Sequence, residues 1–541
     1  RQIALQSVAG QSCGCEVAAC PPLSRVPKTF FITTAIDYTN SPPHIGHAYE
    51  KVLGDVISRY HRLKGEDVFF LTGVDQHGQK VQQSAAKAGI SPAEFVTGIT
   101  DKFKDLWKKL DVKYDDWAET VSPRHKKVVQ GMLQRLFDDG QIYKDKQSGY
   151  YSIRQEQFLT DKERDANGEF GPEWGQVEFR EEENYYFKLS QHKDWLLRYI
   201  ESRKDAVIPD FRQTELRNAV EKLTGDLCIS RPKSRLDWGI ELPFDKDFVT
   251  YVWFDALTNY ISFADYDPSA STFNDQPLSF REKWPALQII GKDILIPAHG
   301  IYWLIMLHAT GFPDEAMPQL LVHGWWNISG TKMSKSLGNI VDPNVLADKY
   351  GVEAVRYYLV SDIGTGKDAD FSEERLIERY NADLANNLGN LLNRTLNMAH
   401  RYRDGVVKNV GGKSPLSGQA ADLLRGYDRA MSAYEIHSAL DRIGEFVTAC
   451  NAYIEMATPW KLAKDPQRAE ALDHTLFVLA EALRVIAILI SPMLPKAAKE
   501  IFYQLNLQDK KLMSDADWGA LPDGHALGKP VPLFPRIEAD A

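Results

Sequence analysis

The sequence predicts an α/β protein in which an insertion splits a parallel-sheet domain and an all-α helix bundle follows. Three observations carry this prediction. The first hundred residues alternate strand, loop, helix and strand signals. Between residues 121 and 220 the pattern changes to short strand-like pieces separated by charged turns. Beyond about Asp370, helical periodicity replaces nearly all strand signals. Fold class follows from such an order of elements.

The first unit begins with Lys28 to Ile36, which reads as a buried strand ending in a proline-containing loop. A helix over His44 to Lys64 follows and stops at Gly65. Asp67 to Gly73 is the next strand, with a turn at Asp75. This order implies a Rossmann-type parallel sheet with a right-handed crossover. Ligands of such sheets bind at the carboxyl ends of the strands, so the turn residues become candidates for a site.

The insertion shows strand-like pieces at Gly149 to Ile153 and at Tyr185 to Leu189, with charged turns such as Asp161 to Arg164 between them. Sheet-like runs resume at Thr250 to Phe254 and at Leu287 to Ile290. Short apolar or β-branched runs bounded by turn residues favour strands. We therefore expect the parallel sheet to continue after the insertion.

The last part of the chain is predicted to be a helix bundle. The apolar stretch Leu320 to Trp326 leads into a loop that is rich in glycine, serine and lysine. Three later stretches place apolar residues with a period of 3.6, namely Asn381 to Arg401, Gln419 to Met456 and Leu472 to Ile490. Amphipathic helices of this kind bury their apolar faces against one another.

Composition narrows the class of protein. The chain has 541 residues, of which 44% are hydrophobic and 26% charged, an ordinary globular balance. It contains no run of eighteen apolar residues, so no membrane span is expected. The net charge of −10 argues against broad, nonspecific binding of nucleic acid but is compatible with a local basic surface.

Cysteine usage favours a reducing compartment. Three of the five cysteines (Cys13, Cys15 and Cys20) lie in the tail and two are isolated, so they form no disulfide framework. The tail, residues 1–26, is rich in small residues, and we interpret it as a disordered end, a processed targeting remnant or a fragment end. Its Cys13-Gly14-Cys15 triplet is expected to be incidental rather than a metal site.

Two motifs carry the chemistry. His44-Ile45-Gly46-His47 lies at a predicted helix start, and Lys332-Met333-Ser334-Lys335-Ser336 lies far downstream. Histidines at i and i+3 share one helix face, and a helix N-terminus attracts phosphate. The lysines add mobile positive charge. Together they predict a device that activates ATP at its α-phosphate and holds the departing pyrophosphate. Two histidines packing a helix start, a histidine metal site, or a solvated lysine loop are the alternatives.

This pair resembles the HIGH and KMSKS signatures of class I aminoacyl-tRNA synthetases. The flanking segments are similar to those of the methionyl-tRNA synthetase family: Thr34 to Tyr38, Gly73 to Gly78, Tyr251 to Ala256 and Gly291 to Ile294. The resemblance runs from about Pro27 to the end of the chain. It implies that methionine and ATP form methionyl-adenylate and pyrophosphate, and that methionine then passes to the 3′ end of tRNA(Met).

The resemblance also implies roles for individual residues. The residues expected to bind the phosphates are His44, His47, Lys332 and Lys335. Mg²⁺ is expected to enter bound to the ATP. Gly46 lets the nucleotide approach the backbone, while Gly291 and Asp293 match positions that contact the ribose. A turn or cap role is the alternative for Asp293.

The methionine pocket implied by the resemblance contains Ala35, Ile36, Tyr38, Asp75, Trp253, Ala256, Tyr260, Ile294 and His299. Asp75 is the natural partner for the α-ammonium group, and sulfur packs well against aromatic edges. Ordinary core packing is the alternative for the aromatic residues. Between Asp293 and His299 the chain is one residue longer than the commoner family pattern, so Ile294 aligns from the left and His299 from the right.

The helical region is expected to read the CAU anticodon of the tRNA. Asn390 and Arg394 are four residues apart and share one helix face, and Trp460 offers a platform on which a base can stack. An amphipathic bundle with a buried tryptophan is the alternative. Because the chain stops soon after Pro532 to Ile537 without a dimerising appendage, we expect a monomer.

The insertion gives a further expectation. Many members of the family hold zinc there with paired CxxC motifs, but this chain has no cysteine between residues 121 and 220, and Ser152 and Gln155 stand where a pair would be. A structural zinc site needs four cysteine or histidine ligands, so we predict no zinc. The insertion is also too short for the editing domain of isoleucyl, valyl and leucyl enzymes.

We divide the chain into a tail (1–26), a Rossmann catalytic first half (27–120), the connective insertion (121–220), a catalytic second half (221–330), a KMSKS and stem-contact region (331–375) and an anticodon-binding helical domain (376–541). A small-molecule nucleotidyltransferase and a noncatalytic tRNA-binding protein are the competing functions. We expect a cytoplasmic enzyme, with a mitochondrion or plastid as the alternative.

Overall fold

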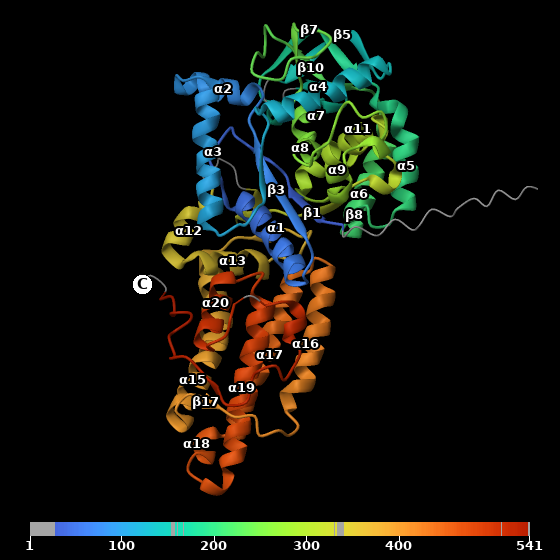
Figure 1. Cartoon of the computed structure of the whole chain (residues 1–541). Coiled ribbons are helices and arrows are strands. Elements are labelled where there is room, and N and C mark those ends of the chain that lie inside the picture. Colours follow the sequence, from blue (N-terminus) through green and yellow to red (C-terminus); the bar gives the residue numbers. More distant parts are fainter. Residues whose placement is uncertain are drawn as a thin grey trace, which may run out of the picture.

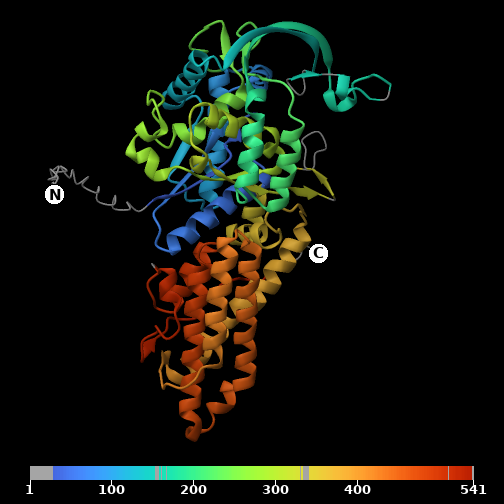
Figure 2. The same cartoon turned by 90° about the vertical axis from the view of Figure 1, so that its right-hand side faces the viewer.

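The computed structural model describes residues 28–152, 157–159, 161–165, 167–328, 330–332, 340–509 and 511–538. It has two lobes (Figure 1). A lobe built on a sheet sits above an elongated bundle of helices, and Figure 2 shows the bundle helices running side by side. The predicted fold class is confirmed.

The central sheet has the strand order β2-β3-β1-β12-β13-β8, and a seventh strand, β4, also pairs with β3. Every pair in this sheet is parallel. The strands are β1 (Phe30–Thr34), β2 (Asp37–Tyr38), β3 (Val68–Asp75), β4 (Asp116–Glu119), β8 (Val207–Ile208), β12 (Leu287–Gly291) and β13 (Gln319–His323). The carboxyl ends of β1, β3 and β12 therefore meet at one edge, where ligands of parallel sheets bind.

Helix α1 (Ile45–Leu63) crosses the sheet and confirms the helix predicted after the first strand. Helices α2 (Gln79–Ala88) and α3 (Pro92–Lys109) follow β3. In the second half, β11 is limited to Phe248–Thr250. The prediction of a sheet-like run to Phe254 is wrong, because Val252–Leu257 form helix α7. Helices α8 (Asn259–Ser262), α9 (Leu278–Lys283) and α11 (Leu304–Ala309) complete this half.

The insertion starts with α4 (Pro123–Asp138) and forms a four-stranded antiparallel sheet in the order β6-β5-β7-β9. Its long strands, β5 (Ile142–Ser152) and β7 (Val177–Phe187), contain most of the predicted pieces and extend them. β6 (Gln157–Leu159) and β9 (Leu227–Cys228) flank them. In the chain, helix α5 (Lys193–Ser202) precedes β8 and helix α6 (Asp210–Glu221) follows it. β8 itself belongs to the central sheet.

A small sheet of β14 (Trp326–Ile328), β15 (Thr331–Lys332) and β16 (Ala369–Asp370) precedes the bundle. Helices α12 (Pro343–Tyr350) and α13 (Val352–Ser361) lie between β15 and β16 in the chain. The helices after β16 are α14 (Glu373–Arg379), α15 (Asn390–Arg403), α16 (Pro415–Ser432), α17 (Ile436–Ala457), α18 (Pro459–Leu462), α19 (Ala469–Ile490) and α20 (Pro495–Gln504). The helical stretch predicted over Gln419 to Met456 is two helices, because Tyr434 turns the chain with φ 59°.

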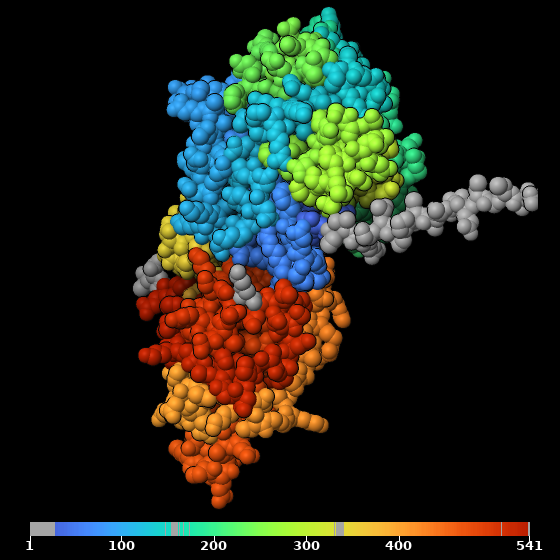
Figure 3. All heavy atoms as spheres, viewed as in Figure 1, coloured from blue at the N-terminus to red at the C-terminus, as the bar shows by residue number. Residues whose placement is uncertain are grey.

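The two lobes share one hydrophobic core. Buried residues of α1, such as Ile57 and Tyr60, belong to the same cluster as Tyr427 of α16 and Leu483 of α19. Figure 3 shows the corresponding contact on the surface, where atoms of α1 lie directly against those of the bundle. Among the described residues, no helix is long and apolar enough to cross a membrane.

Candidate active site

The N-terminus of α1 presents the two histidines of the first motif. Nδ1 of His44 accepts a hydrogen bond from the Gly46 amide (3.1 Å), and Nδ1 of His47 accepts one from the His44 amide (3.1 Å). When Nδ1 of a neutral imidazole accepts, Nε2 carries the proton and becomes a donor. A side chain at Gly46 would come within 2.9 Å of the His44 ring. The sequence thus builds two N–H donors at a helix end that already favours anions.

The second motif is described only in part. Lys332 lies on β15 and pairs with Asn327 of β14. Lys335 and its neighbours from 333 to 339 lie outside the described residues. The backbone amide of Gly330, with φ 72°, donates to the Asp370 carboxylate (2.8 Å), which ties the start of the motif to β16.

The predicted ribose contacts lie at the end of β12. Gly291 is its last residue and Asp293 follows, with the Trp325 indole donating to the Asp293 carboxylate (3.2 Å). A Cβ on Gly291 would stand 2.7 Å from the same carboxylate, so glycine is needed for this close approach. This end of β12 adjoins the end of β1, from which the chain leads to the first motif.

The nine residues predicted to bind methionine line a single cavity of about 360 Å³. They come from the segment after β1, the end of β3, helices α7 and α8, and the chain that follows β12. Lys80, Leu257 and Asn259 also line it and were not predicted, as do Tyr251 and Val252, which the sequence marked only as part of a family segment. The cavity is mostly walled by aromatic and aliphatic groups with a few polar atoms, as small-ligand sites are.

The extra residue between Asp293 and His299 lies where the helical backbone is interrupted, at Ile296 (φ −117°, ψ 121°). Both Ile294 and His299 reach the cavity. The His299 ring bridges the Ile294 carbonyl (2.9 Å) and the Tyr260 hydroxyl (2.7 Å). Burial lowers the pKa of His299 to about 4, so the ring is neutral.

A buried relay behind Asp75 was not predicted. Asp255 contacts His77 Nδ1 (2.7 Å) and His125 Nε2 (2.7 Å), and the His77 amide donates to Asp75 (3.3 Å). Burial opposes ionisation of Asp255, but the two histidines outweigh it and lower its pKa to about 2. Burial, and then the charge of Asp255, raise the pKa of Asp75. A cation placed beside Asp75 would relieve both effects, which suits an ammonium group.

A second buried cluster holds the floor of the cavity. The ammonium of Lys51, on α1, donates to the Ala35 carbonyl, Asp37 and Glu50, each at 2.8 Å. Glu50 also contacts His323 (3.0 Å), which lies beside Gly291. Because its three acceptors satisfy Lys51, the charge is tolerated without solvent. The cluster fixes Ala35 relative to the histidine end of α1.

The predicted anticodon residues lie in the other lobe. Arg394 of α15 pairs with Glu455 of α17 (2.6 Å), and Trp460 follows on α18, half-buried against the bundle core. Asn390 is exposed at the start of α15. The structure thus brings Arg394 to the end of α17 that leads to Trp460.

The insertion carries the prediction about zinc. The Ser152 hydroxyl donates to the Trp174 carbonyl, and Gln155 lies outside the described residues. Within the described part of the chain, no three or more histidine, cysteine or acidic residues are grouped to hold a metal ion. The absence of zinc stays a prediction.

Comparisons with known proteins agree with this geometry. A family model described as class I tRNA synthetases (M) matches residues 30–169 and 174–396. A model of the anticodon-binding domain of methionyl tRNA ligase matches residues 411–541. The first match covers the sheet lobe and the second covers most of the bundle, so both lobes are accounted for.

Similar whole proteins point the same way. A methionine–tRNA ligase of Listeria monocytogenes is 40% identical over 95% of this chain and 78% of its own length. One of Bacillus subtilis is 40% identical over 95% of this chain and 78% of its length. The structure of a Mycobacterium tuberculosis methionyl-tRNA synthetase in complex with methionyl-adenylate matches with a TM-score of 0.87 and 36% identity, covering 94% of this chain and 100% of that chain. The chain belongs to the methionyl-tRNA synthetases, within class I of the tRNA synthetases.

Proposed function

We propose that this protein is a methionine–tRNA ligase, which activates L-methionine with ATP and then charges tRNA(Met). The observation that carries the proposal is the single cavity lined by all nine predicted methionine residues. It lies beside the strand ends that lead to the histidine-bearing start of α1. Amino-acid recognition and phosphate chemistry are thereby neighbours, as adenylate formation requires.

In the proposed first step, the methionine carboxylate attacks the α-phosphate and pyrophosphate leaves. The ammonium group of methionine pairs with Asp75, and its side chain lies among Trp253, Tyr260 and His299. Nε2–H of His44 and of His47 donates to the phosphate oxygens as charge develops. Lys332 and Lys335 neutralise the β- and γ-phosphates, and Mg²⁺ enters with ATP as part of the substrate.

In the second step, a ribose hydroxyl at the 3′ end of the tRNA attacks the methionyl carbonyl of the adenylate, so that an ester bond forms, the bond to the phosphate breaks and AMP leaves. Asn390, Arg394 and Trp460 bind the anticodon, far from the adenylate, so that the bundle selects the tRNA. We propose that the protein works as a monomer without zinc, in the cytoplasm or alternatively in a mitochondrion or plastid. The free thiols of Cys228 and Cys450 are compatible with a reducing compartment.

The experiment is ATP–pyrophosphate exchange measured with each amino acid and without tRNA. We expect exchange with methionine alone. Exchange with isoleucine or cysteine but not with methionine would contradict the assignment. A noncatalytic tRNA-binding protein would show no exchange at all, and a small-molecule nucleotidyltransferase would show none that depends on an amino acid.

A further inference from the structure

A groove of about 600 Å³ runs along the junction of the two lobes. One wall is the C-terminal end of α1 and the segment after α3, and the other is α20 with the chain beyond it. Six cationic side chains line the groove: Arg59, Arg62, Lys113, Lys496, Lys499 and Lys511. Two carboxylates, Asp111 and Asp509, also line the groove, and outside the lining Asp55 pairs with Arg59 (2.7 Å) and Asp115 with Arg62 (2.6 Å). In a protein with a net charge of −10, this local excess of positive charge needs an explanation.

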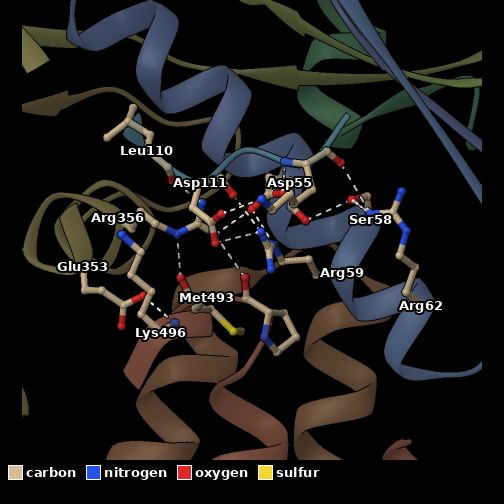
Figure 4. A network of polar contacts seen from close by, with 12 residues as sticks. Asp55, Ser58, Arg59, Arg62, Leu110, Asp111, Glu353, Arg356, Met493 and Lys496 are labelled. Atoms are coloured by element: carbon tan, nitrogen blue, oxygen red, sulfur yellow. Dashed lines mark hydrogen bonds and ion pairs between the residues drawn. The ribbon is translucent and has the colours of Figure 1, made fainter. Parts of the chain in front are cut away.

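The inner side of the groove is a rigid polar network (Figure 4). Asp55 of α1, fully buried, accepts from Arg59 (2.7 Å) and from Arg356 of α13 (2.7 Å). Arg356 also donates to the carbonyls of Leu110, Pro492 and Met493, so both lobes are bound to one guanidinium. Because all of these contacts are made within the protein, the network fixes the shape of the groove. Its charged groups already have partners within the protein.

The carboxylate of Asp111 is also engaged. It accepts from Arg59 (3.3 Å) and Lys113 (2.9 Å). Burial opposes ionisation of Asp111, but the hydrogen bond from Lys113 and the charge of Arg59 outweigh it and lower its pKa. The carboxylate of Asp111 is therefore neutralised by Arg59 and Lys113.

The outer rim has charge that the protein does not balance. Lys496 is exposed, and its backbone amide donates to the Glu353 carboxylate (3.0 Å). Within the described part of the chain, the ammonium groups of Lys496 and Lys511 have no carboxylate within 4.0 Å. Lys499, with 74% of its side chain exposed, comes only within 3.9 Å of Asp509. Three lysines that line one groove attract a polyanion.

We propose that this groove binds the sugar–phosphate backbone of the tRNA, between the anticodon and the acceptor end. The proposal rests on the proposed function. Arg59 lies 15 residues along α1 from His44, which at ~1.5 Å per residue places the groove about 22 Å from the phosphate end of the helix. ATP held there cannot reach it. The tRNA, in contrast, must extend from the bundle to the sheet lobe, and the elements that line the groove, α1 and α20, lie at the junction of the two lobes (Figure 1).

The kind of cation also favours a backbone over a small anion. The rim lysines are spread along the chain: Lys496 and Lys499 lie on α20, and Lys511 lies beyond it. They are not a set of donors that converge on one point. Lysine acts as a flexible point charge without the geometry that selects one ligand. Such contacts orient a nucleic acid without reading its sequence. The groove therefore contributes affinity and orientation, while specificity stays with the anticodon residues.

The test is a charge-reversal triple, Lys496→Glu, Lys499→Glu and Lys511→Glu. Its matched control is Lys204→Glu, Lys222→Glu and Lys246→Glu, which changes the net charge equally at exposed lysines of the sheet lobe. Binding of tRNA(Met) is measured from 50 to 200 mM salt for both. We expect the groove triple to bind tRNA about tenfold more weakly at 200 mM salt and several hundredfold (roughly 600-fold) more weakly at 50 mM. Its log–log salt dependence should be less steep by about three, one for each lost phosphate contact.

Pyrophosphate exchange and melting are measured on the same proteins. Because exchange uses no tRNA, the groove triple should retain methionine-dependent exchange. Equal losses of tRNA affinity in both triples, or an unchanged salt slope, would overturn the proposal. So would binding of inorganic tripolyphosphate that the groove triple abolishes while its tRNA affinity stays intact, since the groove would then be a small-anion site. Wild-type protein without methionine-dependent exchange would instead contradict the proposed function.

Discussion

The cavity that we propose for methionine and the bundle surface that we propose for the anticodon are built in opposite ways. In the cavity, side chains hold one another in place: Tyr260 and the Ile294 carbonyl fix the His299 ring, and two histidines fix Asp255 behind Asp75. In the bundle, Arg394 is paired with Glu455, whose side chain is 61% exposed.

The difference follows from what each region must do. Stabilising charge in a reaction requires groups that need no reorganisation when the charge develops. A surface that receives an RNA loop can exchange an exposed ion pair for RNA contacts at little cost, because such pairs contribute about 0–1 kcal/mol. Substitutions in the cavity should therefore have large effects on both steps, and those in the bundle smaller effects on charging alone.

The largest effect is expected for Asp75→Asn. This change keeps the shape of the side chain but removes the charge that, in the proposed function, pairs with the methionine ammonium group. Breaking a buried charge pair costs about 3–5 kcal/mol. At about 1.4 kcal/mol per factor of ten, this corresponds to a loss of about 10²- to 10⁴-fold in kcat/KM. We expect that loss in kcat/KM for methionine in both pyrophosphate exchange and tRNA charging, with the KM for ATP little changed.

The pH dependence of the same pair provides a control. Burial and the charge of Asp255 raise the pKa of Asp75, whereas an ammonium group pairs with the carboxylate form. The affinity for methionine should therefore fall as the pH falls below that raised pKa. The Asn variant should lack this dependence. An Asp75→Asn protein with an unaltered KM for methionine would show that the ammonium binds elsewhere.

A smaller and more selective effect is expected for Trp460→Ala. Stacking of a base on an aromatic side chain is worth about 1–3 kcal/mol by alanine substitution, so tRNA charging should fall by roughly five- to a hundredfold. Pyrophosphate exchange should barely change because it needs no tRNA. The matched control is Met456→Ala, at a neighbouring side chain that is 72% exposed, and it should leave both activities intact.

Melting separates this result from simple packing, since Trp460 is half-buried against the bundle core. A truncated core tryptophan leaves a cavity and lowers stability. Equal losses in exchange and charging, together with a lower melting temperature, would mean that Trp460 supports the fold and does not meet the anticodon.

The sequence was informative where local patterns decide structure. The helix start at His44 and its stop at Gly65 set α1 to within a residue or two, and the strand Asp67 to Gly73 became part of β3. The run Thr250 to Phe254 misled because valine and aromatic residues suit strands, but a run this short does not separate strand from helix.

Other features depend on contacts that no local pattern records. His77, His125 and Asp255 meet only because α4 and α7 pack beside the end of β3, and their spacing in sequence predicts nothing. The same holds for the basic groove, whose lysines come from segments nearly four hundred residues apart. The predicted cavity residues were recognised from family segments, and the folded chain places them around one space.

The smallest effect is expected for Glu455→Gln. This change tests whether the Arg394–Glu455 ion pair is simply replaced by contacts to the RNA when the tRNA binds. The exposed pair contributes about 0–1 kcal/mol, so melting should hardly change. Removing the charge frees Arg394 for the tRNA, and the KM for tRNA should stay the same or fall by no more than about fivefold. The control Glu445→Gln makes the same charge change at another exposed position of α17. In contrast, Arg394→Ala should raise the KM for tRNA. If Glu455→Gln raised it as much as Arg394→Ala, the tRNA would require the intact pair, and this part of the bundle would be as preorganised as the methionine cavity.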